Sequence, residues 1–191
     1  MFEYVQIGGA FMWPIFCLSV LGVAVLLEKG AYFLFTEIDA TSSFKIKLCN
    51  LILEGDYEKI KEFCKKYKNS LAKTTLFVVE NLGKGASKTQ IDYIAEEAVS
   101  MQLTSLERRT WILGLCASAS PQLGLLGTIV GMIKAFNGLS GGTDAPLVAV
   151  GISEALYTTA FGLIVAIPCV IFYLMINKKI DFILNDLNRI M

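Results

Sequence analysis

Three long stretches of this chain carry no charged side chain. They are residues 4–27, 110–133 and 155–177, which hold 24, 24 and 23 residues respectively. About 20 apolar residues in a helix are enough to cross the ~30 Å hydrocarbon core of a bilayer. The pattern therefore predicts three transmembrane helices, near residues 7–27, 112–136 and 147–176.

The first apolar stretch is expected to stay in the mature protein. Residues 1–6 include an acid and no base, whereas a signal peptide starts with a basic segment. The apolar stretch also exceeds the roughly 7–15 residues of a signal-peptide core. It therefore counts as a membrane span.

Basic residues set the expected orientation of the three spans. Thirteen of the 17 Lys and Arg residues lie within 28–110 and three within 177–191, while residues 1–6 and 137–146 contain none. Basic loops are retained on the cytoplasmic side of a membrane. We therefore expect residues 28–110 and 177–191 to be cytoplasmic, and residues 1–6 and 137–146 to lie outside.

The long cytoplasmic segment is expected to fold as a small helical bundle. Asp56 is a suitable N-cap for an amphipathic stretch over 57–68. Ser87 and Gln90 have the spacing of a capping box, in which each side chain accepts a hydrogen bond from the other residue's backbone. A helix is therefore predicted to begin at each of these points.

Helical periodicity continues beyond the second and third spans. Before the second span it comprises Ile91, Ile94, Ala98, Met101 and Ser105, and after the third it comprises Ile176, Ile180, Ile183, Leu187 and Ile190. No Gly or Pro interrupts the first set before Gly114. Both spans are thus predicted to extend into the cytoplasm, packing together and with copies of themselves. The expected fold is an all-α, homo-oligomeric membrane protein with these extensions in a cytoplasmic helical bundle.

Composition narrows the functional classes. The chain has 54% hydrophobic and 18% charged residues, a formal net charge of zero and no histidine. A balanced charge gives no basic excess for nucleic acid, and the missing imidazole removes the commonest metal ligand and general base. Five cysteines without CxxC spacing are typical of packing residues. We expect no nucleic acid, metal or cofactor, and no enzymatic activity.

Small residues recur at alternating spacings of three and four along the second and third spans. The stripe of the second span is Gly114, Ala117, Pro121, Gly124, Thr128, Gly131 and Ala135, and that of the third is Ala155, Thr159, Gly162 and Ala166. Small faces allow transmembrane helices to pack closely. They could equally line a central space in which the threonine hydroxyls bind water or an ionisable partner. The stripes alone leave both interpretations open.

Glu154 is the most informative single residue, because a carboxylate within a span is costly and marks a functional site or a buried pairing. At about 100° per residue it lies about 140° around the helix from Thr159, which directs it toward a neighbouring helix. Both an inter-helix hydrogen bond and direct proton handling remain open. Lys134 is expected to extend to the membrane surface, and Pro121 and Pro168 are predicted to bend their helices.

Two runs carry a family resemblance. They are GLLGTIVGM at residues 124–132 and GISEALYTTAFGLIVAIP at residues 151–168. In this order and spacing they resemble the signature of the MotA/TolQ/ExbB proton channel family, and the ExbB branch most. The likeness is strong over 105–178, and the three-span layout extends it along the chain. The chain lacks the fourth span of MotA-type members and the long N-terminal segment of some ExbB members.

The resemblance implies a subunit of a bacterial inner-membrane stator with a periplasmic N-terminus and a cytoplasmic C-terminus. Its second and third spans would line the pore of a homopentamer that holds the transmembrane helices of an ExbD-like dimer. The family's pore threonines correspond to Thr128 and Thr159, and its intramembrane glutamate to Glu154. The implied role is to convert the proton motive force into mechanical work on a TonB-like protein for outer-membrane import.

Two alternatives stay open at this point. A TolQ-like subunit would use the same machinery for outer-membrane maintenance. A non-conducting membrane scaffold would use the small-residue stripes only to assemble an oligomer.

Overall fold

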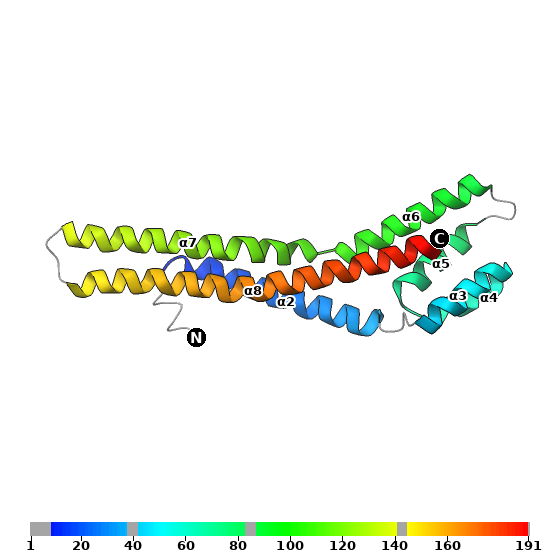
Figure 1. Ribbon diagram of the computed structural model, residues 1–191, viewed down its shortest axis with the longest axis horizontal. Helices are drawn as coiled ribbons and strands as arrows, with labels where there is room; N and C mark the ends of the chain where they lie inside the picture. The colour runs from blue at the N-terminus through cyan, green and yellow to red at the C-terminus, as the bar shows by residue number, and fades with distance from the viewer. Residues whose placement is uncertain (1–8, 38–41, 83–86, 141–144, 191) are drawn as a thin grey trace. The chain divides into compact units, whose positions relative to one another are not determined.

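A computed structural model describes residues 9–37, 42–82, 87–140 and 145–190, and these residues are almost entirely helical (Figure 1). The helices are α2 (Met12–Thr36), α3 (Ser42–Glu54), α4 (Tyr57–Lys65), α5 (Ser70–Asn81), α6 (Lys88–Glu107), α7 (Thr110–Ser140) and α8 (Ala145–Ile190). The described ranges contain no strand. The prediction of an all-α protein is confirmed.

Three of these helices are long and apolar enough to cross a membrane. The qualifying segments are Met12–Thr36, Thr110–Asn137 and Val148–Arg189. They carry the three stretches without charge, so the prediction of three transmembrane helices is confirmed. The position of the bilayer along each helix stays a prediction.

The chain divides into two compact units. The first contains Met1–Leu27 and Arg109–Met175, and the second contains Glu28–Arg108 and Ile176–Met191. The first unit therefore holds α7, most of α2 and the N-terminal part of α8. The second holds α3 to α6 and the two remaining helix ends.

In the first unit, α2 packs against both other apolar helices at one glycine. A Cβ atom on Gly22 would lie 3.0 Å from Sγ of Cys169 on α8 and 3.7 Å from Sγ of Cys116 on α7. The Cys116 thiol also donates a hydrogen bond to the carbonyl of Leu18 at 3.3 Å. These cysteines are free thiols that fill a three-helix contact.

In the second unit, α3 packs on α4, α4 on α5 and α5 on α6. Phe44 of α3 stacks on Phe63 of α4, with ring centroids 5.3 Å apart. Between α5 and α6 the core consists of Val78, Ala95 and Ala98. The predicted small helical bundle is thus present as four short helices.

Both predicted helix starts in this unit are confirmed. The Asp56 carboxylate accepts a hydrogen bond from the backbone N–H of Lys59 at 3.3 Å and caps α4. The backbone N–H of Ser87 donates to Oε1 of Gln90 at 2.9 Å, and the N–H of Gln90 donates to Oγ of Ser87 at 3.4 Å, which completes the capping box of α6. Helix α4 ends at Lys65, three residues before the predicted end.

The helical extension of the third span also forms. Helix α8 runs without interruption to Ile190. Within the second unit its buried side chains are Ile176, Ile180, Ile183 and Leu187. Asp186 on the same part of α8 forms an ion pair with Lys45 of α3. The side chain of Ile190, the last member of the predicted set, lies outside the described residues.

The extension before the second span differs from the prediction in two respects. The expected continuous helix is broken, because α6 ends at Glu107 and Arg109 has a left-handed backbone with φ 64°. No Gly or Pro marks this break in the sequence. The predicted face is correct in its first half, where Ala98 is buried and Ile94 packs against the same core. It is wrong in its second half, because Met101 and Ser105 are exposed while Leu106 is buried. Packing on α5 selects the face, and the small Ala95 and Ala98 allow the closer approach.

Candidate functional site

Helices α7 and α8 form the polar, closely packed centre of the first unit. Figure 1 shows them side by side. Their buried facing residues are Leu113, Cys116, Ser120, Gly124, Gly127, Gly131 and Ala135 on α7, and Gly151, Ala155, Thr158, Gly162, Ala166 and Cys169 on α8. We call this set the α7–α8 seam. Most of its members are glycine, alanine, serine or threonine.

Glycines bring the two backbones into direct contact at the seam. A Cβ atom on Gly124 would lie 3.0 Å from the carbonyl oxygen of Thr158 and 3.0 Å from Cα of Thr159. One on Gly162 would lie 2.6 Å from the carbonyl oxygen of Ser120, and one on Gly131 would lie 2.9 Å from the carbonyl oxygen of Gly151. Because backbone atoms cannot move aside like a flexible side chain, these positions require glycine.

The predicted stripe of α7 belongs only partly to this seam. Gly124, Gly131 and Ala135 lie within it, whereas Ala117, Pro121 and Thr128 lie beside it and are half-buried. The alternating spacing of three and four averages 3.5 residues, and such a stripe drifts around a straight helix with 3.6 residues per turn. The buried positions of α7 repeat about every 3.7 residues from Leu113 to Ala135, so they leave the predicted line in its first half. Gly114, the first member of the stripe, still faces α8, because a Cβ atom there would lie 3.3 Å from the ring of Tyr173.

The predicted stripe of α8 agrees more closely with the seam. Ala155, Gly162 and Ala166 are buried within it. Thr158 replaces Thr159 at the centre, because Thr158 is 1% exposed while Thr159 is only half-buried. Thr159, the threonine of the predicted stripe, therefore lies at the edge of the seam, and Thr158 lies within the seam.

The two predicted pore threonines use their hydroxyl protons differently. Thr128 Oγ1 donates to the carbonyl of Leu125 in its own helix at 2.7 Å. Thr159 Oγ1 donates across the helix pair to the carbonyl of Gly124 at 3.0 Å. A hydroxyl that donates one hydrogen bond keeps its acceptor lone pairs. Both oxygens can thus still accept a proton or a water hydrogen.

Two buried hydroxyl residues of the seam were missed by the sequence prediction. Thr158 Oγ1 donates to the carbonyl of Ala155 at 2.8 Å and contacts the carbonyl of Glu154 at 3.2 Å. The hydroxyl of Ser120 is buried and has no hydrogen-bond partner among the described residues. The one sequence signal for Thr158 is that it also lies three residues after Ala155 and four before Gly162.

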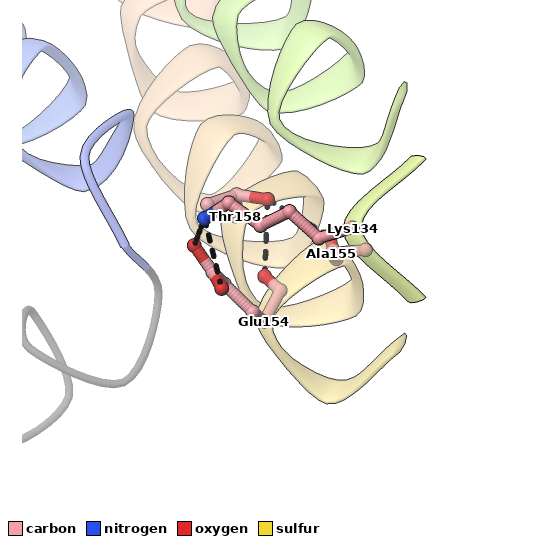
Figure 2. A network of polar contacts seen from close by, with 4 residues as sticks. All are labelled: Lys134, Glu154, Ala155 and Thr158. Carbon is pink, nitrogen blue, oxygen red and sulfur yellow. Dashed lines mark hydrogen bonds and ion pairs between the residues drawn. The ribbon is translucent and has the colours of Figure 1, made fainter. Parts of the chain in front are cut away.

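Glu154 of α8 pairs with Lys134 of α7, whose side chain reaches across to the carboxylate, as Figure 2 shows. The ammonium Nζ of Lys134 lies 3.1 Å from Oε1 and 3.4 Å from Oε2 of Glu154. The Glu154 side chain is 19% exposed and that of Lys134 is 56% exposed. The sequence predicts only that Lys134 extends to the membrane surface, and it does not predict the pairing with Glu154.

The two prolines that are predicted to bend their helices both lie inside continuous helices. Pro121 lies within α7 and Pro168 within α8. A bend at either position stays a prediction. The described residues contain no group of three metal-ligating side chains. The polar groups in and beside the α7–α8 seam include hydroxyls, thiols, backbone carbonyls and the Lys134–Glu154 ion pair.

The chain has three long apolar helices, and two of them are joined by a seam of small and hydroxyl residues with an ion pair near one end. These features define a multi-pass helical membrane protein. The profile of the MotA/TolQ/ExbB proton channel family matches residues 60–189, which include all of α7 and nearly all of α8. The chain belongs to this family. Its members are channel and transport proteins rather than enzymes, and the family and the apolar helices support a multi-pass inner-membrane protein.

Named relatives come from both the ExbB and the TolQ branches. The putative biopolymer transport protein ExbB-like 3 of Synechocystis sp. is 32% identical over 176 residues, 86% of this chain and 79% of that protein. The biopolymer transport protein ExbB of Helicobacter pylori is 39% identical over 105 residues, 54% of this chain and 72% of that protein. The Tol-Pal system protein TolQ of Haemophilus influenzae is 44% identical over 91 residues, 47% of this chain and only 40% of that protein.

Proposed function

We propose that the chain is an ExbB-like subunit of a proton-driven stator. Five copies would form a ring whose α7 and α8 helices surround the single transmembrane helices of an ExbD-like dimer. Proton flow through this ring would move the partner and transmit work to a TonB-like protein for outer-membrane import. One charge crossing 100 mV releases about 2.3 kcal/mol, so several protons supply enough energy for such a movement.

The family match over residues 60–189 carries this proposal. It includes Thr128 and Thr159, which we assign to the proton pathway together with Glu154. Their arrangement supports the assignment chemically. Each threonine oxygen retains acceptor capacity beside a helix pair that excludes bulky side chains, so a water or a partner carboxylate can approach.

The orientation proposed for this role has residues 1–6 and 137–146 in the periplasm and residues 28–110 and 177–191 in the cytoplasm. The distribution of basic residues supports it. Ala117 and Pro121, which lie beside the seam, would face the pore or a neighbouring subunit. Gly124, Gly131, Ala155, Gly162 and Ala166 would hold the two pore helices together.

Proton uptake by liposomes that contain the chain and its ExbD-like partner tests the conducting function. Thr128→Val and Thr159→Val preserve shape and remove the hydroxyl, so each is expected to lower uptake by about 10²-fold, the lower end of the usual contribution of one proton-transfer group. Thr104→Val is the matched control, because Thr104 is an exposed threonine of α6 that donates only to the carbonyl of Ser100. Normal uptake by both pore variants would exclude the two hydroxyls from the proton pathway, whereas no uptake by the wild-type complex would favour a non-conducting scaffold.

A TolQ-like role is the second candidate, because the Haemophilus influenzae relative is named TolQ and is 44% identical over 91 residues. Deleting the gene in its host separates the two roles. Loss of energised outer-membrane uptake with an intact envelope supports the ExbB-like role. A leaky outer membrane with normal uptake supports the TolQ-like one. A TonB-like reading frame beside the gene would agree with the first outcome.

A further inference from the structure

The ion pair between Lys134 and Glu154 lies at the end of the α7–α8 seam nearest the connection between the two helices. Lys134 precedes the end of α7 at Ser140, and Glu154 follows the start of α8 at Ala145. The ammonium contacts both carboxylate oxygens, at 3.1 and 3.4 Å. It therefore restrains the rotation of each helix about its own axis as well as their separation.

The carboxylate also rests against a third segment. Gly9 has φ +68°, and a Cβ atom built on it would lie 1.6 Å from Oε1 of Glu154. The carbonyl of Gly9 accepts a hydrogen bond from the N–H of Met12, the first residue of α2, at 3.2 Å. The acid thus occupies a space that only glycine leaves open, close to the positive end of the α2 helix dipole.

The same turn of α8 links this pair to the proposed proton pathway. The backbone carbonyl of Glu154 is contacted by the hydroxyl of Thr158 at 3.2 Å. A Cβ atom on Gly127 would lie 2.5 Å from that hydroxyl oxygen. Gly127 and Thr158 directly precede Thr128 and Thr159 along the chain. A change in helix register at Glu154 would therefore displace both threonines.

We infer that Lys134 and Glu154 form a positioning pair that sets the register of α7 and α8. In this chain Glu154 serves the proton pathway through Lys134, by holding the pathway's helices in place, and does not itself carry the transported proton. The predicted change in proton flow rests on the proposed function, whereas the predicted changes in Tm do not. Both residues lie within the predicted spans, where removing one partner would leave the other charge uncompensated. The register of α7 and α8 thus depends on the attraction between two opposite charges, and mutation can exchange their positions.

The test uses the complex with the ExbD-like partner and four variants. These are Lys134→Gln, Glu154→Gln, the double Gln variant, and the exchanged pair Lys134→Glu with Glu154→Lys. Lys179→Gln is the control, because Lys179 is an exposed lysine of α8 in the other unit. Thermal unfolding in detergent and proton uptake by liposomes between about pH 6 and 8 are measured for each chain.

Each single Gln variant is expected to lower Tm by about 3 °C. Proton uptake should fall by about tenfold at every pH, because the groups of the proton pathway are displaced. The exchanged pair should regain most of both losses, and the double Gln variant should lose less than the two single variants combined. Lys179→Gln should match the wild type.

Two results would overturn the inference. The first is a Glu154→Gln variant that takes up no protons beside a Lys134→Gln variant with the wild-type rate and pH profile. The second is an exchanged pair that regains Tm and stays inactive, since both results assign proton transfer to the carboxylate itself. If the wild-type complex takes up no protons, the proposed function fails. The Tm values then still test whether Lys134 and Glu154 act as a pair. Strictly additive losses of Tm in the double Gln variant would exclude the pair.

Discussion

The hydroxyl of Thr159 on α8 donates a hydrogen bond to the backbone carbonyl of Gly124 on α7 over 3.0 Å. The bond joins two helices at the point where Gly124 has no side chain and its Cα can lie close to α8. Hydrogen bonds between transmembrane helices contribute about 0.6 kcal/mol on average. The same residue thus serves helix packing and the proposed proton pathway, and mutations must separate these roles.

Adjacent threonines on α8 allow this separation. Thr159→Val removes a bond between helices and is expected to lower the free energy of unfolding by about 0.6 kcal/mol. Thr158→Val removes only bonds to carbonyls that its own helix already uses, so its expected cost is smaller, below about 0.5 kcal/mol. Unfolding titrations in mixed micelles measure both. A larger loss in Thr158→Val than in Thr159→Val would contradict the assigned bonding.

The glycines of the seam are expected to tolerate no larger side chain. Gly162→Ala would place its Cβ atom 2.6 Å from the carbonyl oxygen of Ser120. Overpacking of this kind costs about 1–3 kcal/mol, which thermal unfolding should reveal as a lower Tm. Gly30→Ala is the control, because a Cβ atom on Gly30 meets nothing within 4 Å. It should stabilise α2 by up to about 1 kcal/mol, and equal effects of the two substitutions would refute the seam geometry.

Glu37 is expected to stabilise the second unit from a buried position. It is 5% exposed, and Oε1 accepts hydrogen bonds from the backbone N–H of Ser70 at 3.0 Å and from the Ser70 hydroxyl. The side-chain amide of Gln102 on α6 donates to the same hydroxyl at 2.9 Å. Glu37→Ala leaves the N–H of Ser70 without its acceptor, at a cost of about 1–3 kcal/mol.

Chemical denaturation of the detergent-solubilised chain measures this loss. Glu37→Gln keeps an acceptor oxygen in place and should retain more stability than Glu37→Ala. If the two variants were equally unstable, the carboxylate oxygen would not be the stabilising group.

Two cysteines outside the predicted membrane spans should differ in thiol reactivity. Burial raises the pKa of Cys64 on α4 to about 11, and its side chain is 1% exposed. Cys49 on α3 is exposed. Only the thiolate reacts with iodoacetamide, so at pH 7.5 Cys49 should be labelled at least about tenfold faster than Cys64. Labelling of Cys64 should accelerate as the pH rises toward its pKa.

Peptide mapping by mass spectrometry follows the two sites separately, and Cys49→Ser provides the control for assignment. Equal labelling rates in the folded chain would show that Cys64 is accessible. In the unfolded chain the two rates should converge, because burial no longer distinguishes the thiols.

The sequence alone determined the features that depend on local chemistry. Uncharged length predicted three helices that could cross a membrane, because an unpaired charge is costly in lipid and the length of an uncharged stretch is read directly from the sequence. The caps at Asp56 and Ser87 followed from side chains that bond their own backbone. The family was evident from the runs at 124–132 and 151–168.

Tertiary structure decided which residues meet. Periodicity gave the correct small-residue composition of α7 and α8, but a slight difference between 3.5 and about 3.7 residues per repeat moves the seam away from Ala117 and Pro121. Thr158 and Thr159 are adjacent in sequence, and only the partner helix determines which one is buried. Lys134 and Glu154 lie twenty positions apart, and no local spacing rule connects them. Their pairing depends on how two helices face one another, which is settled by the packing of the whole unit.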